Sequence, residues 1–299
     1  LSTAATPQRT SLSVTGTAAA VRAALGVSLV DWQTAEGSRF HRPDGAPRIP
    51  LDVRNSVAAI VGLDTEPNIH SAFGPRGPMH GAGVPDGGLV PATVRRAYEI
   101  EPLHAAGILG NGQTIAILSL DALTPSDVDL FDERYGITGP PVETVKIDGA
   151  LQAPGDEAAE VALDVQVVRG IAPQAQIINY EGPKTGAGIA ALMARIVADG
   201  RADIVSISWG GCEKLLGEQN VRAIDQEFEA AFAAGISVFV ASGDNGAYGC
   251  RRFPVSADPL DRDNAASASY PGSSPSVISV GGTFLNTLAD GTYVSEAGW

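Results

Sequence analysis

Residues 176–208 read QIINYEGPKTGAGIAALMARIVADGRADIVSIS, a stretch that predicts a strand, a helix and a second strand. Apolar runs over 176–180 and 204–208 flank a segment with helical spacing over 188–199. Short continuous apolar runs joined by helices are typical of parallel strands that are covered on both faces. The segment therefore indicates an α/β fold with a mostly parallel sheet.

The same alternation extends outward, from about residue 112 to about residue 280. We expect strands over 114–120, 144–147, 176–180, 204–208, 237–241 and 277–280, and helices over 126–135, 156–169, 188–199 and 219–234. In sheets of this kind, functional groups gather beyond the carboxyl ends of the strands. Candidate site residues are therefore sought in the loops that follow the predicted strands.

Residues 1–63 predict a small α+β unit. We expect strands over 11–14, 28–33 and 38–41, a helix over 17–25 between Thr17 as N-cap and Gly26 as stop, and helical spacing over 50–62. Residues 64–91 are rich in proline and glycine, so they predict an exposed linker without helix or ladder, the kind of segment that proteases cut. Residues 92–299 then form the α/β domain.

The composition excludes some classes of protein. Of 299 residues, 20 are basic and 34 acidic, which gives a net charge of −14, and 44% are hydrophobic. The acidic balance argues against nucleic-acid binding, which needs a cationic surface. No stretch approaches the roughly 18 continuous apolar residues of a membrane span. The sequence starts without an initiator Met or an apolar signal core, so we expect any targeting segment to lie outside it.

Two carboxylates, Glu160 and Asp164, stand four residues apart in the predicted helix over 156–169. This spacing places both on one face, one turn apart. Acidic residues near a helix N-terminus often only face solvent and interact with the helix dipole. Asp164, however, lies inside an apolar run, and two close like charges raise one pKa, which makes a carboxylate a usable base. Spacing alone leaves both interpretations open.

Two glycine-rich loops follow neighbouring predicted strands. Ser208, Trp209 and Gly210 end one strand, and Asp244 follows the next. We expect these loops to lie side by side above the sheet, with Trp209 as a candidate pocket wall. Asp244 could equally be a turn residue that caps its own loop, and Trp209 an ordinary partly buried aromatic residue.

Four motifs occur in the order and context of the sedolisins, which are serine-carboxyl peptidases: EVALD at 160–164, SISWG at 206–210, SGD at 242–244 and SSPSVISVGGT at 273–283. The sequence resembles this family over essentially its whole length. The resemblance implies a subtilisin-like, mostly parallel sheet with helices on both faces. It also implies that residues 1–63 are part of a small α+β, ferredoxin-like activation prodomain.

The resemblance implies a role for each acidic residue in an acid-acting endopeptidase. Glu160 becomes the general base that activates a serine, and Asp164 orients Glu160 and shares its proton. Asp244 becomes the oxyanion partner, which requires it to be protonated, because a carboxylic acid can donate a hydrogen bond and a carboxylate would repel the oxyanion. A carboxylate base works best in acid. Residues 208–210 fall in the substrate-binding segment.

Other properties follow from the same resemblance. Cys212 and Cys250, which spacing alone could also leave as unrelated thiols, fall where some members have a disulfide. Closing that loop contributes about 4 kcal/mol and favours an oxidising, secreted setting. Calcium is expected for the family, but no metal ligand is assigned in this chain. The expected partners are peptide or protein substrates and the chain's own prodomain, with activating cleavage between residues 64 and 92.

The sequence departs from the family pattern at two places. The family's nucleophile lies in a Gly-Thr-Ser segment, and the sequence stops before one, although GGTF at 281–284 imitates it. We therefore expect this zymogen segment alone to be inactive, with a second chain as one source of the serine. Ser119 stands where some members carry a glutamate, so the carboxylate network should be shorter here.

Two rival interpretations were weighed. A histidine-dependent subtilase needs a histidine in a Gly-Thr context; His41, His70 and His104 lack that setting, and His80 lies in the linker. A catalytically inactive, sedolisin-like binding or interaction protein would explain the absent nucleophile. An inactive protein, however, has no chemical need for all three acidic residues, which favours the enzyme.

Overall fold

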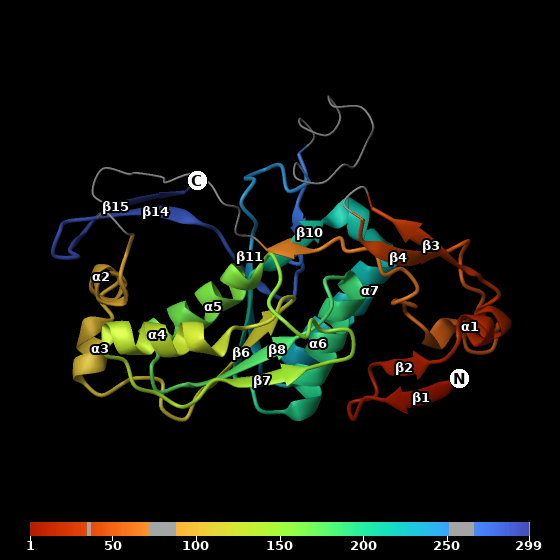
Figure 1. The fold of residues 1–299 in the computed structure, drawn as a ribbon, viewed down its shortest axis with the longest axis horizontal. Helices are drawn as coiled ribbons and strands as arrows, with labels where there is room; N and C mark the ends of the chain where they lie inside the picture. The colour runs from red at the N-terminus through yellow and green to blue at the C-terminus, as the bar shows by residue number, and fades with distance from the viewer. Residues whose placement is uncertain (35–36, 72–87, 251–265, 299) are drawn as a thin grey trace.

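The computed structural model describes residues 1–34, 37–71, 88–250 and 266–298. At its centre lies a six-stranded parallel sheet with the order β13-β11-β9-β6-β8-β7 (Figure 1). The strands are β6 (Thr114–Ser119), β7 (Glu143–Lys146), β8 (Gln176–Glu181), β9 (Ile204–Ile207), β11 (Ser237–Ala241) and β13 (Ile278–Val280). Every expected strand of the α/β domain is confirmed to within one residue at each end.

The apolar runs that predicted these strands fill the core. Ile117, Leu118, Ile177 and Ile178 are completely buried, because helices cover both faces of β6 and β8. Such burial stabilises each aliphatic side chain by about 1.5–3 kcal/mol. The sheet is thus a rigid base on which the loops at its carboxyl ends are carried.

Helices lie on both faces of the sheet, as predicted. They are α2 (Pro91–Ala97), α3 (Glu101–Ala105), α4 (Pro125–Tyr135), α5 (Ala158–Ile171), α6 (Gly186–Asp199) and α7 (Glu213–Ala233). Helix α5 packs with α2 and α4, whereas α6 packs with α7, and Figure 1 shows these two groups on opposite sides of the strands. None of the helices in the described part of the chain combines the length and the apolar character needed to cross a membrane.

The connections through α5 and α6 have opposite hands. Both β7–α5–β8 and β8–α6–β9 run toward the β13 edge of the sheet, yet their helices lie on opposite faces. Parallel crossovers are almost always right-handed, so one of the two connections has the uncommon hand. The result is that the N-terminus of α5 is presented on the face opposite to α6 and α7.

A second, antiparallel sheet lies beside the carboxyl ends of the parallel strands. Its order is β12-β10-β5, with β10 (Trp209–Cys212) between β12 (Ser269–Tyr270) and β5 (His70–Ser71). β5 falls in the segment predicted to form no ladder, so that prediction is wrong at 70–71, where β10 supplies the hydrogen-bonding partner. Gly211 permits this approach, because a Cβ there would lie 2.7 Å from the Asn68 carbonyl oxygen.

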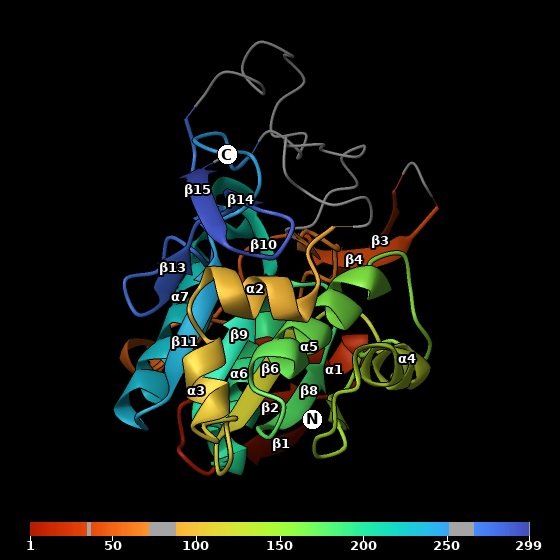
Figure 2. The same ribbon diagram turned by 90° about the vertical axis from the view of Figure 1, so that its left-hand side faces the viewer.

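The N-terminal unit is α+β, as predicted. It contains the hairpins β1 (Ser2–Ala5) with β2 (Leu12–Thr15) and β3 (Leu29–Gln33) with β4 (Arg39–Pro43), and the helix α1 (Ala18–Leu25) between them. Thr17 caps α1 by accepting from the Ala20 N–H, and Gly26 ends it in the left-handed conformation, both as expected. In Figure 2 a further hairpin, β14 (Thr283–Thr287) with β15 (Tyr293–Gly298), lies near the C-terminus.

The helix predicted from the spacing over 50–62 is not formed. One 3-10 turn, Arg54–Ser56, is present, and the following residues run irregularly. Leu51 and Val53 are exposed, and the Ile60 N–H donates to the Gln219 side chain of α7 at 3.2 Å. The N-terminal unit also contacts α6 and α7 through Gln8, which donates to the Ala194 carbonyl, and Thr10, which donates to Glu227.

Candidate active site

The N-terminus of α5 is fixed by a buried aspartate that follows strand β6. Asp121 is 2% exposed, and its carboxylate accepts from the N–H groups of Ala122, Gly155 and Glu157 at 2.7–3.0 Å. Burial by itself would raise the pKa of Asp121, but the Gly155 and Ala122 N–H groups and Lys184 outweigh it and lower that pKa. An ionised Asp121 therefore holds the loop that leads into α5.

Helix α5 carries both predicted carboxylates. Glu160 lies in its first turn and is only 3% exposed, so the solvent-facing interpretation of this residue is wrong. Asp164, one turn later, is partly exposed as a residue, but its Oδ2 atom is buried. The apolar neighbours Val161 and Val165, both completely buried, turn this face of α5 toward the core.

Asp164 links α5 to the loop that ends β9. The Ser208 hydroxyl donates to Asp164 Oδ1 at 2.6 Å, and within the described part of the chain Asp164 Oδ2 has no hydrogen-bond partner. Burial raises the pKa of Asp164 to about 6, against which the Ser208 hydrogen bond acts. Asp164 is therefore protonated in mild acid, where an ordinary aspartate is ionised.

Asp244 shares one cavity with two of the substrate-binding candidates, Trp209 and Gly210, whereas Ser208 does not line it. A space of about 30 Å³ is lined by His70, Ser71, Trp209, Gly210, Ala241, Gly243, Asp244, Asn245, Gly249 and Ser269. Gly243 adopts φ +91° and a Cβ there would lie 3.1 Å from Ser269, so a side chain at 243 would be both strained and crowded. The predicted pairing of the 208–210 and 244 loops is confirmed. Glu160 does not line this cavity.

Strand β5 occupies the edge of β10 in that cavity. Ser71 is registered with Trp209 and His70 with Gly210, in antiparallel orientation. The Ser71 N–H points away from β10 and donates to Glu157 Oε1 at 2.9 Å, and His70 Nδ1 lies 3.8 Å from the same oxygen. A two-residue segment of the chain is therefore held between the edge of β10 and the start of α5.

Lys184 joins the two acidic groups at the start of α5. Its Nζ lies 3.1 Å from Asp121 Oδ2 and 2.9 Å from Glu157 Oε2, and 5.9 Å from the centre of the Trp209 ring. Partial burial would lower the pKa of Lys184, but Glu157 and Asp121 outweigh it and raise that pKa. Lys184 thus stays charged and sits beside the wall of the cleft.

The other chemistry-bearing residues lie around this centre. Ser119 is completely buried, and its hydroxyl donates to the Asn179 side chain at 2.6 Å. Asn179 in turn donates to the Glu181 carboxylate, so Ser119 is part of a buried hydrogen-bond chain that ends at Glu181. Cys212 and Cys250 form a disulfide, which the resemblance implied. The Trp209 side chain is 1% exposed, and in the described residues its Nε1 has no hydrogen-bond partner.

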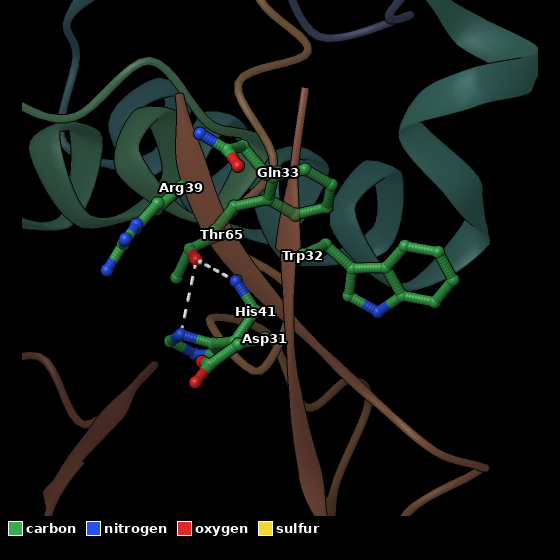
Figure 3. A pocket seen from close by; sticks show the side chains of 7 residues that line it. Asp31, Trp32, Gln33, Arg39, His41 and Thr65 are labelled. Carbon is green, nitrogen blue, oxygen red and sulfur yellow. Dashed lines mark hydrogen bonds between the residues drawn. The ribbon is translucent and has the colours of Figure 1, made fainter. Parts of the chain in front are cut away.

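A larger cavity, of about 560 Å³, lies on the N-terminal unit. Asp31, Trp32, Gln33, Arg39, Phe40, His41 and Thr65 line it, and Figure 3 shows Thr65 bonded to His41 there. It contains none of the predicted site residues. Among the described residues, no group of three or more His, Cys, Asp or Glu could hold a metal ion. No chemical step is therefore assigned to a metal ion.

Comparison with known proteins agrees with this geometry. A family model described as "Subtilase family" matches residues 150–297, which include α5, β10 and Asp244. Kumamolisin of Bacillus sp. (strain MN-32) is 31% identical over 300 residues, which cover 96% of this chain and 51% of kumamolisin. Sedolisin of Pseudomonas sp. (strain 101) is 28% identical, covering 98% of this chain and 51% of that protein.

A solved structure of Pseudomonas sedolisin, a serine-carboxyl proteinase in complex with pseudo-iodotyrostatin, has a TM-score of 0.59 and 25% identity over 73% of this chain and 59% of that one. The parallel sheet with its flanking helices is thus a subtilisin-like α/β fold. Within that class, the chain belongs to the sedolisin family. The chain spans about half the length of the curated relatives it matches.

Sequence reasoning missed several residues that shape this site. Asp121, Glu157 and Lys184 were not singled out, nor was the His70–Ser71 segment. One signal was present for Asp121, which directly follows a predicted strand at its carboxyl end. Lys184 follows β8, the neighbour of β6 in the sheet, in the same way. The remaining contacts depend on tertiary structure alone.

Proposed function

We propose that this chain carries the carboxylate groups of an acid-acting serine-carboxyl endopeptidase. Glu160 is the general base, Asp164 its partner, and Asp244 the group that stabilises the oxyanion. The observation that carries the proposal is the shared cavity, in which Asp244 lies against Trp209 and Gly210 and an extended peptide segment already pairs with β10. Membership of the sedolisin family supports the same roles.

The proposed chemistry is acyl transfer. A serine hydroxyl attacks the peptide carbonyl carbon while its proton passes to Glu160, and the carbonyl electron pair moves onto the oxygen. Asp244, protonated in acid, donates a hydrogen bond to that oxygen. The leaving amine then takes the proton from Glu160, and water repeats the sequence to release the acyl group. Glu160 is only 3% exposed, so bulk water is largely kept from the proposed base.

Asp164 serves this scheme as a proton-holding partner. Its raised pKa of about 6 keeps it neutral under acid conditions, so it adds no second negative charge beside Glu160. The Ser208 hydroxyl fixes its orientation through Oδ1. The buried Oδ2, which has no other partner in the described residues, is then available to share a proton.

We further infer that residues 1–63 act as an activation prodomain and that residues 64–91 connect it to the peptidase domain. The contacts of Gln8 and Thr10 with α6 and α7 support docking of this unit on the catalytic domain. The pairing of β5 with β10 supports a substrate-like, inhibitory path for the connecting segment. The expected processing region includes residues 72–87, which lie outside the described residues. Export is favoured by the disulfide.

The test is peptide hydrolysis by the native protein, purified with everything that stays bound to residues 1–299, at about pH 4. Glu160→Gln and Asp244→Asn should each lower kcat/KM at least about a hundredfold. Asp156→Asn removes an equal charge from an exposed neighbouring position and should leave kcat/KM unchanged. Intact-mass analysis of the same material would reveal a second chain with a Gly-Thr-Ser sequence. Full activity in Glu160→Gln would contradict the proposal, and binding of peptides without hydrolysis would favour the inactive, binding-protein alternative.

A further inference from the structure

We propose that Glu157 is a specificity-determining residue of the peptide cleft and selects a cationic side chain on the peptide residue that lies opposite Gly210. This inference rests on the proposed function, because it treats the edge of β10 as the place where peptides bind. Three observations carry it: the register of β5 on β10, the two contacts of Glu157 with β5, and the charge balance of the group formed by Glu157, Lys184 and Asp121.

The first observation is that a peptide segment is already present on β10. His70 lies opposite Gly210 and Ser71 opposite Trp209, so β5 indicates the register that an extended peptide adopts on this edge. Gly210 has little room for a side chain, since a Cβ would lie 3.0 Å from the Ser269 hydroxyl. The peptide side chain opposite Gly210 therefore meets no bulk on β10, and its selectivity must come from the other wall.

The second observation is that Glu157 forms that other wall. Its Oε1 accepts from the Ser71 N–H at 2.9 Å and lies 3.8 Å from His70 Nδ1, so one oxygen contacts both the peptide backbone and the side chain opposite Gly210. Glu157 stands at the N-cap position of α5, yet its side chain makes no capping hydrogen bond to the helix. The carboxylate is directed into the cleft instead.

The third observation is the charge balance. Asp121 and Glu157 contribute two negative charges and Lys184 one positive charge, which leaves a net charge of −1. Asp121 has a fully buried side chain and three N–H donors in addition to Lys184, so its charge is satisfied internally. The remaining negative charge lies on Glu157 and faces β5 through Oε1, because Lys184 contacts the other carboxylate oxygen, Oε2. A cation at His70 or its peptide equivalent is thereby favoured.

Solvent access defines which cations fit. The His70 side chain is 46% exposed and that of Glu157 is 19% exposed, so the position is open at its outer side. A longer lysine or arginine side chain can reach Oε1 without displacing the core. The preferred substrates are therefore peptides with histidine, lysine or arginine opposite Gly210, and glutamate or aspartate there should be disfavoured by like-charge repulsion.

A double-mutant cycle tests the charge selection without catalysis. Amide hydrogen exchange of Ser71 is measured on the full 299-residue chain at about pH 5, which lies between the ordinary pKa values of glutamate and histidine side chains. Glu157→Ala should speed exchange of the Ser71 amide by about tenfold, through loss of a charge-assisted hydrogen bond. Asp156→Ala, the neighbouring exposed acidic position, should leave it unchanged.

His70→Gln should speed Ser71 exchange about threefold when Glu157 is present and have no effect in the Glu157→Gln background, as expected for a half-exposed ion pair. His70→Lys should retain slow exchange only when Glu157 is present. Equal effects of His70→Gln in the two backgrounds, or slow exchange in Glu157→Ala, would overturn the inference.

The proposed function is tested separately, on the native protein at about pH 4, with paired peptides that carry lysine or glutamine opposite Gly210. A preference for lysine that is lost in Glu157→Gln supports the inference, and an unaltered preference overturns it. If the native protein cleaves neither peptide, the proposed function fails, whereas the exchange cycle still decides whether Glu157 selects cations.

Discussion

Asp164→Asn should stabilise the protein at neutral pH and have little effect in acid. Burial raises the pKa of Asp164 to about 6, against an ordinary value of 3.8, despite the hydrogen bond from Ser208. Asparagine has nearly the same shape and keeps an oxygen that can accept from Ser208, but it has no charge to bury. The substitution therefore removes the ionisation while leaving the contact to Ser208 in place.

The magnitude and the sign follow from linkage. The difference between about 6 and 3.8 corresponds to about 3 kcal/mol. The pKa of Asp164 is higher in the folded state than in the unfolded state, so the folded state binds the proton more tightly. Proton binding by Asp164 therefore stabilises the fold fully below about pH 4, and this stabilisation is lost as the pH rises through about 6. Above that value, ionised Asp164 destabilises the fold, by up to about 3 kcal/mol; the partial exposure of the residue makes this an upper bound.

Urea unfolding, followed by the fluorescence of the buried Trp209, measures the effect. The free energy of unfolding of Asp164→Asn should exceed that of the unsubstituted chain by about 2 kcal/mol at pH 8 and by almost nothing at about pH 4. Asp156→Asn, which removes an exposed charge from the same region, should show no such pH dependence. A difference that stays constant from pH 4 to pH 8, or that grows in acid, would refute the assignment of a raised pKa to Asp164.

Three further perturbations test other parts of the structure. Cys250→Ser opens the disulfide with Cys212, whose sequence separation is 38, and should lower the free energy of unfolding by about 4 kcal/mol in urea titrations under non-reducing conditions. Lys184→Met leaves the buried carboxylate of Asp121 without its cation and should destabilise by about 3 kcal/mol, seen as a lower Tm, whereas unchanged Tm would show that the backbone N–H groups suffice. Burial raises the pKa of Glu227, so Glu227→Gln should stabilise the chain at pH 8 but not at about pH 4; a pH-independent effect in the same titration would contradict this.

The parallel sheet could be predicted from the sequence because its strands are short apolar runs with no competing pattern. The strands are covered on both faces, and core residues such as Ile177 and Val205 are completely buried. A continuous apolar run was therefore a reliable signal for a strand. The helix predicted over 219–234 corresponds to the longer, second piece of α7, because Gly217, with φ +77°, breaks the helical geometry between Glu213 and that piece. The short piece that precedes Gly217 was not predicted.

The failed helix over 50–62 shows the limit of periodicity. Val53, Val57 and Ile60 have helical spacing, but they do not share a buried helical face: Val53 is exposed, and the segment around Ile60 bonds to α7 through Gln219. A spacing pattern shows that apolar side chains recur at helical intervals. It does not show whether the backbone N–H groups will bond within a local helix or to a neighbouring helix. Tertiary contact decided the conformation here.

In the candidate site, too, some residues could be predicted from a local sequence pattern and others could not. Glu160 and Asp164 could be found because one helical turn separates them in sequence. The link from Asp121 to Lys184 spans 63 residues, and no local pattern relates the two. Their proximity is a consequence of β6 and β8 being neighbours in the sheet, which only the strand order reveals.

Strand order also links the position of the proposed base, Glu160, to that of the proposed specificity residue, Glu157. Asp121 binds the N–H of Glu157 and so sets where α5 begins, and with it the first-turn position of Glu160. The same carboxylate holds Lys184, which in turn holds the Glu157 side chain against β5. The proposed base and the proposed specificity residue therefore share Asp121 as one buried support, so a substitution at Asp121 should alter both turnover and peptide preference, whereas a substitution at Glu157 should alter preference alone. Asp121 can serve both because it is buried two residues after the central strand β6, where three N–H groups and Lys184 hold its carboxylate.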